Sequence, residues 1–203
     1  MASAASIAVM SIQKRRERER AERERLIVAA ARELAEAEGW EAVTTRRLAA
    51  EIEYSQPVLY SHFKGKEAIM AAVAVEGCAE LAAELRAART AVSGHREALA
   101  AVGEAYTAFA RRRPALYDAI FTLDVGLPFA TPEAPAELWE AFGELSRAVA
   151  PVAAEGEDPA LLTETYWAAL HGLATLTRSG RLPEEAHAAR LALLTGHFAA
   201  GAS

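Results

Sequence analysis

Apolar residues along this chain recur at the three- and four-residue spacing of helices, and no stretch shows the alternation of a strand. The first regular face ends at Gly39, and glycine commonly follows the last turn of a helix. The members of this face are Leu26, Ile27, Ala30, Ala31 and Leu34. The pattern predicts a first helix that ends at Gly39, with Trp40 packed back on its end.

Two short helices are predicted next, joined by a turn at residues 53–55. Thr44 and Thr45 stand where the N-cap of the first is expected, and Leu48 and Ile52 lie one turn apart on its inward face. A short helix, a tight turn and a second short helix, all after a longer one, form a helix-turn-helix plan.

The second short helix is predicted from Gln56 to Phe63. Ser55 is its candidate N-cap, and Pro57 lies in its first turn, where the missing N–H of a proline costs nothing. Leu59 and Phe63 are four residues apart and are expected to face the core.

The same periodicity predicts further helices over residues 66–89, 94–112, 114–123, 133–150, 159–179 and 184–199. Prolines mark four of their starts: Pro114, Pro132, Pro159 and Pro183. Thr131 and Asp158 are candidate N-caps, and Gly180 is a candidate helix stop. Residues 124–132 and 151–157 are expected to be loops.

These elements predict an all-α fold with an N-terminal three-helix helix-turn-helix domain (18–65) and a C-terminal helical domain (66–203). Residues 1–17 are expected to be disordered or a helical basic arm, because residues 1–13 carry no period. Along residues 14–25 charges of both signs alternate, and opposite charges four apart support a solvated helix. This segment is either a charged helical extension or a basic arm that touches DNA.

Composition favours a soluble cytoplasmic protein. Its 52% apolar share is mostly Ala and Leu, which favour helix. The single cysteine, Cys78, cannot form an internal disulfide and fits a reducing compartment. No apolar run approaches the roughly 20 residues needed to cross a membrane. The mildly apolar start precedes the positive charges, which is the wrong polarity for a signal peptide.

The net charge of −6 is unevenly distributed. Residues 1–66 carry a net charge of +2 and residues 67–203 a net charge of −8. A mildly basic region can still bind a polyanion, because the Debye length is only about 8 Å at physiological salt. The weak excess implies few phosphate contacts per subunit, and therefore binding as a dimer.

Polar side chains gather on the second short helix and in the turn after it. Hydroxyl, imidazole and ammonium groups suit phosphate oxygens, and the amide of Gln56 can pair with adenine. The candidate DNA-binding residues are Thr44, Thr45, Arg46, Ser55, Gln56, Pro57, Tyr60, Ser61, His62, Lys64 and Lys66.

About residues 20–75 resemble the DNA-binding domain of TetR-family repressors. The signature is the run LYSHFKGKE at residues 59–67, and Thr44-Thr45 and Leu48-Ala49 also match. The resemblance implies a dimeric transcription repressor that binds a palindromic operator and is released by a small-molecule effector. It also implies that the C-terminal helical domain (66–203) is a ligand-binding and dimerisation domain. One position departs from the family, which usually has glycine where Glu53 stands.

Two motifs in the C-terminal part resemble the ligand domains of one branch of this family. They are WAALHGL at residues 167–173 and RRRPALY at residues 111–117. The candidate ligand contacts are Tyr106, Phe109, Tyr117, Phe121, Trp139, Phe142, Trp167 and His171. The alternative is that they are core side chains, with His171 bonded to a nearby backbone or hydroxyl group. An aromatic site with few charges predicts an apolar, planar effector with one or two polar groups.

Small residues follow one face of the predicted helix 159–179 and would let a second helix approach closely. They either pack within the chain or form a two-fold interface with helix 184–199, the four-helix bundle that the family would imply. The candidate dimer contacts are Ala168, Gly172, Thr175, Leu191 and Leu194.

Neither a metal nor a cofactor is expected, because His95, His187 and His197 lack acidic or cysteine partners at metal-ligand spacing. The competing classes are a helical enzyme and an architectural or constitutive DNA-binding protein without an effector. The enzyme is disfavoured by the lack of a glycine-rich phosphate loop, a nucleophile elbow and paired metal ligands. Operator binding without any cofactor would separate a repressor from an enzyme. A thermal-shift screen would separate it from an effector-free DNA-binding protein, which no small molecule should stabilise.

Overall fold

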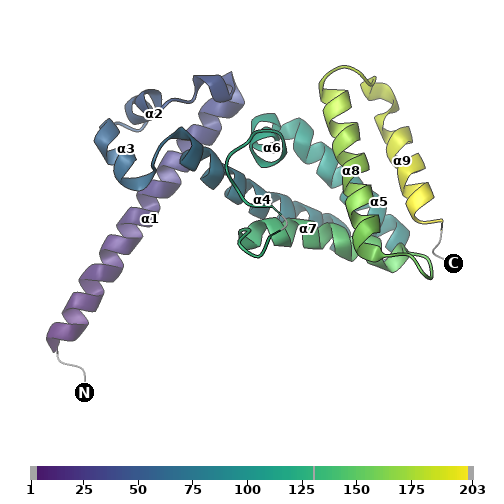
Figure 1. The fold of residues 1–203 in the computed structure, drawn as a ribbon, viewed down its shortest axis with the longest axis horizontal. Helices are drawn as coiled ribbons and strands as arrows, with labels where there is room; N and C mark the ends of the chain where they lie inside the picture. The colour runs from purple at the N-terminus through teal and green to yellow at the C-terminus, as the bar shows by residue number, and fades with distance from the viewer. Residues whose placement is uncertain (1–3, 130, 201–203) are drawn as a thin grey trace. The chain divides into compact units, whose positions relative to one another are not determined.

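Across residues 4–129 and 131–200, which the computed structural model describes, the chain is helical and has no strand (Figure 1). This confirms the predicted all-α class. The α-helices are α1 (Ala4–Glu38), α2 (Thr45–Glu51), α3 (Gln56–His62), α4 (Lys66–Thr90), α5 (His95–Arg112), α6 (Pro114–Phe121), α7 (Ala136–Val149), α8 (Pro159–Arg178) and α9 (His187–Phe198). Short 3-10 helices are η1 (Trp40–Ala42), η2 (Ala150–Val152) and η3 (Glu184–Ala186). None of these helices is both long and apolar enough to cross a bilayer.

The chain divides into two compact units. The first, which we call the head, runs to Val73 and includes Asp124–Gly126; the second, the body, comprises Ala74–Leu123 and the chain from Leu127 on. The division therefore falls inside α4, whereas the sequence suggested a boundary at its start. Helix α4 is continuous, so one helix belongs to both units.

In the head, α1, α2 and α3 pack around a small apolar core (Figure 1). Ile27 and Ala31 of α1, Leu48 of α2 and Leu59 of α3 are fully or almost fully buried. Leu26 was expected on the same face but is exposed, because successive helix residues point about 100° apart and it falls just outside the buried stripe.

The turn between α2 and α3 bends at Glu53, which alone among the described non-glycine residues has a positive φ, of 56°. The N–H of Glu53 donates to the carbonyl of Ala50 at 3.3 Å, and the N–H of Tyr54 donates to that of Ala49 at 2.8 Å. A side chain in the left-handed region costs roughly 1–2 kcal/mol. The head therefore keeps its turn with strain at the position where the sequence departs from the family.

Two expectations about helix starts were wrong. Residues 4–13, expected to be disordered, are helical, while residues 1–3 lie outside the described residues. Helix α7 begins at Ala136 after Pro135, and not at Thr131–Pro132. The physical reason is that a proline disfavours the helical conformation of the residue before it, which here is Ala134.

Other predicted caps are confirmed. Asp158 accepts a hydrogen bond from the N–H of Ala160 at 2.9 Å at the start of α8, and Gly180, with φ of 69°, follows its end. The last predicted helix is divided, because η3 precedes α9.

Helix α5 packs against α6, α7, α8 and α9 and forms the centre of the body. Its Tyr106 and Phe109 are fully buried, as are Tyr117 of α6 and Tyr166 of α8. The hydroxyl of Tyr166 donates to the carbonyl of Leu99 at 2.9 Å. The buried polar ends of these aromatic residues thus have partners, as burial requires.

One carboxylate is buried between α4 and α7. Glu144 of α7 is only 1% exposed and accepts hydrogen bonds from Arg86 at 2.8 Å, from Arg89 at 2.8 and 2.9 Å, and from Arg147 at 2.9 Å. Burial alone would raise its pKa, but these hydrogen bonds and the charges of Arg89 and Arg147 outweigh burial and lower it. Glu144 is therefore ionised at neutral pH and ties α7 to α4.

Candidate nucleic-acid interface and ligand cavity

Helix α3 is held to the head by one side and exposes the other. Leu59 is buried, whereas Gln56, Pro57 and Ser61 are exposed and Tyr60 is 53% exposed. A short helix anchored in this way can place its outer side chains in a DNA groove. We call the exposed set on and beside α3 the reading face.

The two predicted N-caps behave differently. The hydroxyl of Thr44 accepts from the N–H of Arg47 at 3.1 Å and caps α2, as predicted. Ser55 stands at the N-cap of α3, but its side chain makes no capping hydrogen bond. Its exposed hydroxyl is therefore not engaged as a cap. The hydroxyl of Ser61, in contrast, is engaged within α3, because it donates to the carbonyl of Val58 at 2.6 Å.

Side chains on α2 complete the reading face. Thr45 lies within 3.4 Å of the hydroxyl of Tyr60, so the start of α2 adjoins the outer side of α3. Arg46 is exposed, whereas its neighbour Arg47 forms an ion pair with Glu38 of α1. Arg46 is therefore the arginine of α2 that projects outward.

His62 is not on the reading face. Its side chain is 6% exposed, and its Nδ1 lies 3.2 Å from Glu24 of α1, which also pairs with Arg20 at 2.8 Å. Arg20 in turn donates to the carbonyl of Ser61 at 3.4 Å. The DNA contact expected of His62 is corrected to an internal role, because it fastens the end of α3 to α1.

The two lysines after α3 also differ. Lys64 is exposed, whereas the ammonium group of Lys66 donates to the carbonyl of Trp40 at 2.5 Å. Lys66 is thus turned toward η1 and helps to hold the start of α4. Of the two, only Lys64 is presented as the sequence predicted.

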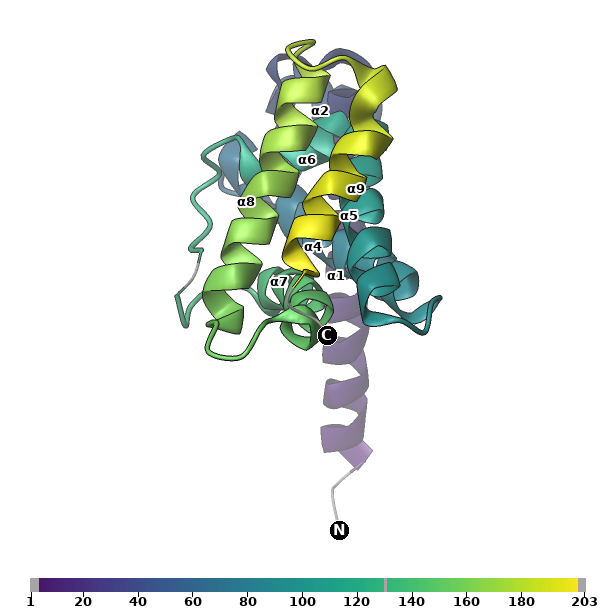
Figure 2. The same ribbon diagram turned by 90° about the vertical axis from the view of Figure 1, so that its right-hand side faces the viewer.

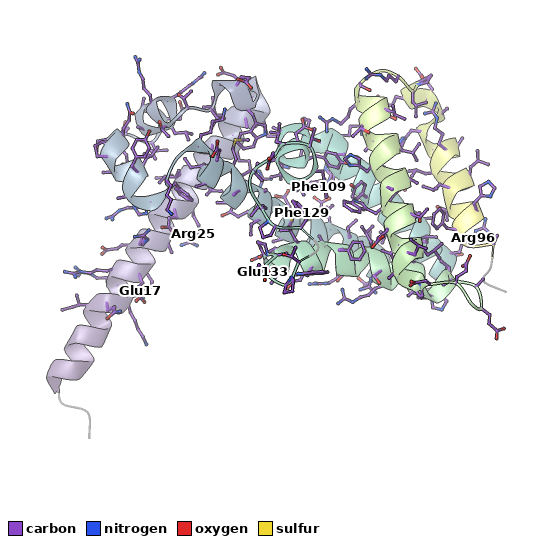
Figure 3. All side chains as sticks on the ribbon, viewed as in Figure 1. Glu17, Arg25, Arg96, Phe109, Phe129 and Glu133 are labelled. Atoms are coloured by element: carbon purple, nitrogen blue, oxygen red, sulfur yellow. The ribbon has the colours of Figure 1, made fainter. Side chains whose placement is uncertain are left out.

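The first half of α1 carries a solvated set of charges. Arg15 pairs with Glu19 at 3.3 Å, and the side chains of Glu17 and Arg25 project from the helix (Figure 3). The helical form of this segment agrees with both interpretations, extension and DNA-binding arm.

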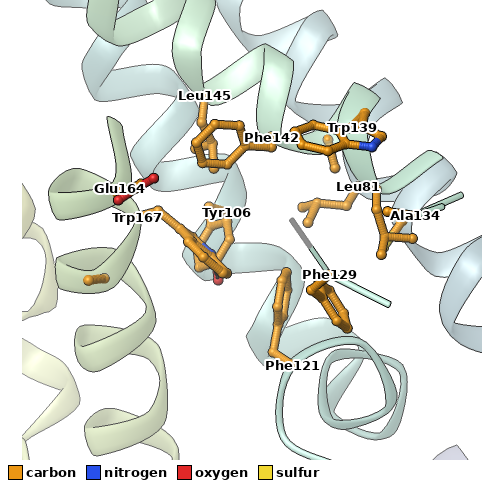
Figure 4. Close-up of a pocket in the computed structure, with 14 residues that line it drawn as sticks. Leu81, Tyr106, Phe121, Phe129, Ala134, Trp139, Phe142, Leu145, Glu164 and Trp167 are labelled. Carbon is orange, nitrogen blue, oxygen red and sulfur yellow. Dashed lines mark hydrogen bonds between the residues drawn. The ribbon is translucent and has the colours of Figure 1, made fainter. Parts of the chain in front are cut away.

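The body contains a partly open cavity of about 610 Å³ (Figure 4). This volume is typical of sites for small molecules. Its wall comes from α4, α5, α6, α7, α8 and the loop before α7, and the lining residues are Cys78, Leu81, Tyr106, Phe121, Phe129, Ala134, Leu138, Trp139, Ala141, Phe142, Leu145, Glu164, Trp167 and Ala168. Burial raises the pKa of the Cys78 thiol to about 12, so the cavity meets a neutral thiol there.

The structure brings five of the predicted ligand contacts to this cavity, which are Tyr106, Phe121, Trp139, Phe142 and Trp167. Phe109, Tyr117 and His171 do not line it. Phe109 and Tyr117 are fully buried. Figure 3 labels Phe109 among the side chains of the body. Phe109 and Tyr117 thus pack as the alternative interpretation has them, and His171 is half-buried and bonded to the hydroxyl of Tyr117. Contact of these three residues with a ligand stays a prediction.

Four polar side chains form one chain of hydrogen bonds that begins in the cavity wall, at Trp167 and Tyr106, and continues outside the lining to Tyr117 and His171. The indole N–H of Trp167 donates to the hydroxyl of Tyr106 at 3.0 Å, the two tyrosine hydroxyls of Tyr106 and Tyr117 are 3.0 Å apart, and the hydroxyl of Tyr117 lies 2.6 Å from Nδ1 of His171. Burial lowers the pKa of His171, and the charge of Arg178 lowers it further. A neutral imidazole accepts or donates at Nδ1 according to its tautomer, so the bonds from Tyr106 to His171 have two consistent directions.

The lining residues that sequence reasoning missed are mostly aliphatic, but they also include Cys78, Phe129 and Glu164. Leu138, Ala141 and Leu145 share one face of α7, and this helical spacing was visible in the sequence. Phe129 and Ala134 lie in the segment before α7, and no local pattern connects that segment to α4 or α8.

Helices α8 and α9 lie side by side (Figure 2). Both helices carry large apolar side chains that are exposed. Leu161 of α8 is 62% exposed and Leu193 of α9 is 66% exposed. The predicted stripe of Ala168, Gly172 and Thr175 lies on α8 and is exposed or half-buried. Of the two predicted α9 contacts, Leu194 is half-buried, and Leu191 is buried because Leu191, Thr195 and Ala199 form the inward stripe.

Two family profiles match this chain. The profile described as bacterial regulatory proteins of the tetR family matches residues 27–73, and the one described as the tetracyclin repressor-like C-terminal domain matches residues 99–196. Together they cover more than half of the chain, including α3 and most of the residues around the cavity.

Individual proteins are also similar. The uncharacterized HTH-type transcriptional regulator YobS of Bacillus subtilis (strain 168) is 33% identical over 96 residues, which are 47% of this chain and 50% of YobS. The match therefore spans about half the length of that relative.

Solved structures share the fold at lower identity. A protein with unknown function from Rhodococcus sp. RHA1 has a TM-score of 0.74 at 24% identity, over 88% of this chain and 94% of that one. The transcriptional regulator FadR from Bacillus subtilis, solved in complex with stearoyl-CoA, has a TM-score of 0.65 at 15% identity, over 87% and 97% of the two chains. With both profiles matched and this fold, the chain belongs to the TetR family of bacterial transcriptional regulators.

Proposed function

We propose that this protein is a repressor that binds a palindromic operator as a homodimer and is released by a small effector bound in the body. The observation that carries the proposal is the reading face. Gln56, Tyr60 and Lys64 are exposed on or just after a helix whose buried side fixes it to the head. Their amide, hydroxyl and ammonium groups match base edges and phosphates.

The exposed apolar face of α8 and α9 supports the homodimer. Leu161, Leu176 and Leu193 would be removed from water if two copies packed these helices together. A two-fold arrangement presents two identical heads, and two half-sites about one helical turn (~34 Å) apart on a palindrome match such symmetry.

The cavity supports control by a small molecule. It is lined by Cys78 and Leu81 of α4, the helix whose first turns belong to the head. An effector that shifts α4 would act on an element that both units share. Binding of effector and operator would then be coupled, each weakening the other.

The test is selection of double-stranded DNA from a random pool by the full chain without any added ligand. We expect enrichment of an inverted repeat. Gln56→Ala should alter the preferred bases in each half-site, because a bidentate amide–adenine pair contributes roughly 1–3 kcal/mol of discrimination. A pool that stays random after repeated rounds would contradict the proposal, while an unchanged preference in Gln56→Ala would move the readout to Ser55, Pro57 or Ser61.

A further inference from the structure

The cavity wall combines many aromatic rings with one carboxylate. Its aromatic members are Tyr106, Phe121, Phe129, Trp139, Phe142 and Trp167. Glu164 of α8 is the charged residue of the lining, and it makes no hydrogen bond or ion pair with any described residue. Figure 4 places its carboxylate at the edge of the cavity, beside Trp167 and Phe142.

The polar hydrogens of this wall are largely committed elsewhere. The N–H of Trp167 is donated to the hydroxyl of Tyr106, and that hydroxyl also shares a hydrogen bond with the hydroxyl of Tyr117. The lining contains no lysine, arginine or histidine. The indole N–H of Trp139 is neutral and half-exposed, so it cannot balance an anionic ligand.

We propose that the cavity binds a lipophilic organic cation, with its apolar body against the aromatic rings and its positive charge beside Glu164. This rests on the proposed role of the cavity as the effector site. Aromatic faces attract cations through their quadrupoles, and a carboxylate at the edge of an apolar cavity adds a charge partner. A ligand with a carboxylate or phosphate would place its charge near Glu164 with no cation in the wall to offset it.

The size of the cavity agrees with such a ligand. About 610 Å³ holds a fused aromatic ring system with a substituted ammonium group. Glu164 is exposed to solvent, so a cation can reach it while keeping part of its hydration. The charge is therefore expected to set selectivity, while the aromatic wall sets the size and flatness of the ligand.

The experiment is calorimetric titration of the full chain with three probes that share one aromatic body: naphthylmethyl-trimethylammonium, naphthylmethanol and naphthylacetate. We expect the cation to bind about tenfold more tightly than the alcohol, and the acetate to bind more weakly than the alcohol. Glu164→Gln should remove the advantage of the cation and leave the affinity for the alcohol unchanged. Glu155→Gln is the matched control, because Glu155 is exposed and outside the lining, and it should keep the advantage.

Each other result overturns the inference. Equal binding of cation and alcohol, or a cation advantage that survives Glu164→Gln, would mean that the carboxylate does not select the ligand. If such probes still release operator DNA, the proposed repressor function stands without the charge preference. If no probe binds although the operator is selected normally, the cation site fails and DNA binding is unaffected. The wild-type series keeps the test decisive even if a variant folds poorly.

Discussion

Lys64 is the lysine after α3 that stays exposed, since Lys66 is bound to the carbonyl of Trp40. We predict that Lys64→Ala weakens binding to all DNA sequences alike, because an ammonium group contacts phosphate and not a base edge. The slope of log affinity against log salt should fall by about 0.9 for each phosphate that the variant no longer neutralises. Filter binding across a salt series measures this slope, and an unchanged slope would remove Lys64 from the interface. Lys66→Ala should instead lower the melting temperature.

Glu53 shows how a single residue can be strained without harm to the fold. Its φ of 56° is one that glycine adopts freely, so Glu53→Gly should raise the free energy of unfolding by about 0.5–1 kcal/mol, after the greater entropy of unfolded glycine is allowed for. Chemical denaturation measures the change. Glu51→Gly, within α2, is the control and should destabilise by about 1 kcal/mol. A destabilised Glu53→Gly variant would show that the Glu53 side chain supports the turn.

At the scale of the elements, the helices of this chain were predictable because periodicity and capping residues are local signals. Asp158 and Gly180 bound α8 as expected, since a cap depends on neighbours within one turn. The start of α7 was not predictable from Pro132 alone, because Pro135 offers the same signal three residues later. The inward turn of His62 depends on Glu24, a residue 38 positions away, and no local pattern shows such a partner.

The attachment of α7 to α4 depends on Glu144 and its three arginines. Removing the charge with Glu144→Gln leaves the guanidinium groups of Arg86, Arg89 and Arg147 facing a neutral amide. We expect a decrease of about 1–3 kcal/mol in the free energy of unfolding, less than for a fully buried pair because Arg86 and Arg147 are half-exposed. Thermal and urea denaturation at neutral pH measure it.

The same carboxylate predicts a pH dependence. Because the pKa of Glu144 is lowered in the folded state, its contribution is complete above its usual value near 4.5 and is lost as the pH falls through the lowered value. The wild type should therefore lose stability relative to Glu144→Gln as the solution is acidified below about pH 4.5. Stability curves for the two proteins that stay parallel well below pH 4.5 would contradict the assignment.

At the scale of the whole molecule, the cavity shows where sequence reasoning ends. Five of its six aromatic members were found from residue type. Cys78 and the sixth aromatic residue, Phe129, were not found, because they reach the wall only through the packing of α4 and of the loop before α7. The apolar character of a site is therefore visible in a sequence, whereas its boundary depends on tertiary packing. Glu164 was likewise not among the predicted ligand contacts, and its proposed role in selecting the ligand depends on its place at the cavity.

Release from DNA by a ligand must be visible as a difference between the affinity of the ligand for the free protein and its affinity for the operator complex. Helix α4 begins at Lys66 in the head, buries Ile69 and Val73 there, and lines the cavity in the body with Cys78 and Leu81. We expect the ligand to favour a position of α4 that differs from its position in the operator complex. The ligand should then bind the operator complex 5- to 150-fold more weakly than the free protein, a coupling of about 1–3 kcal/mol. Titrating naphthylmethyl-trimethylammonium into the free protein and into the operator complex measures both affinities. The operator must in turn bind the liganded protein more weakly by the same factor, because coupling between two sites is reciprocal. Equal affinities in the two titrations would rule out release through this cavity, however tightly the ligand binds, since a ligand without preference shifts no equilibrium.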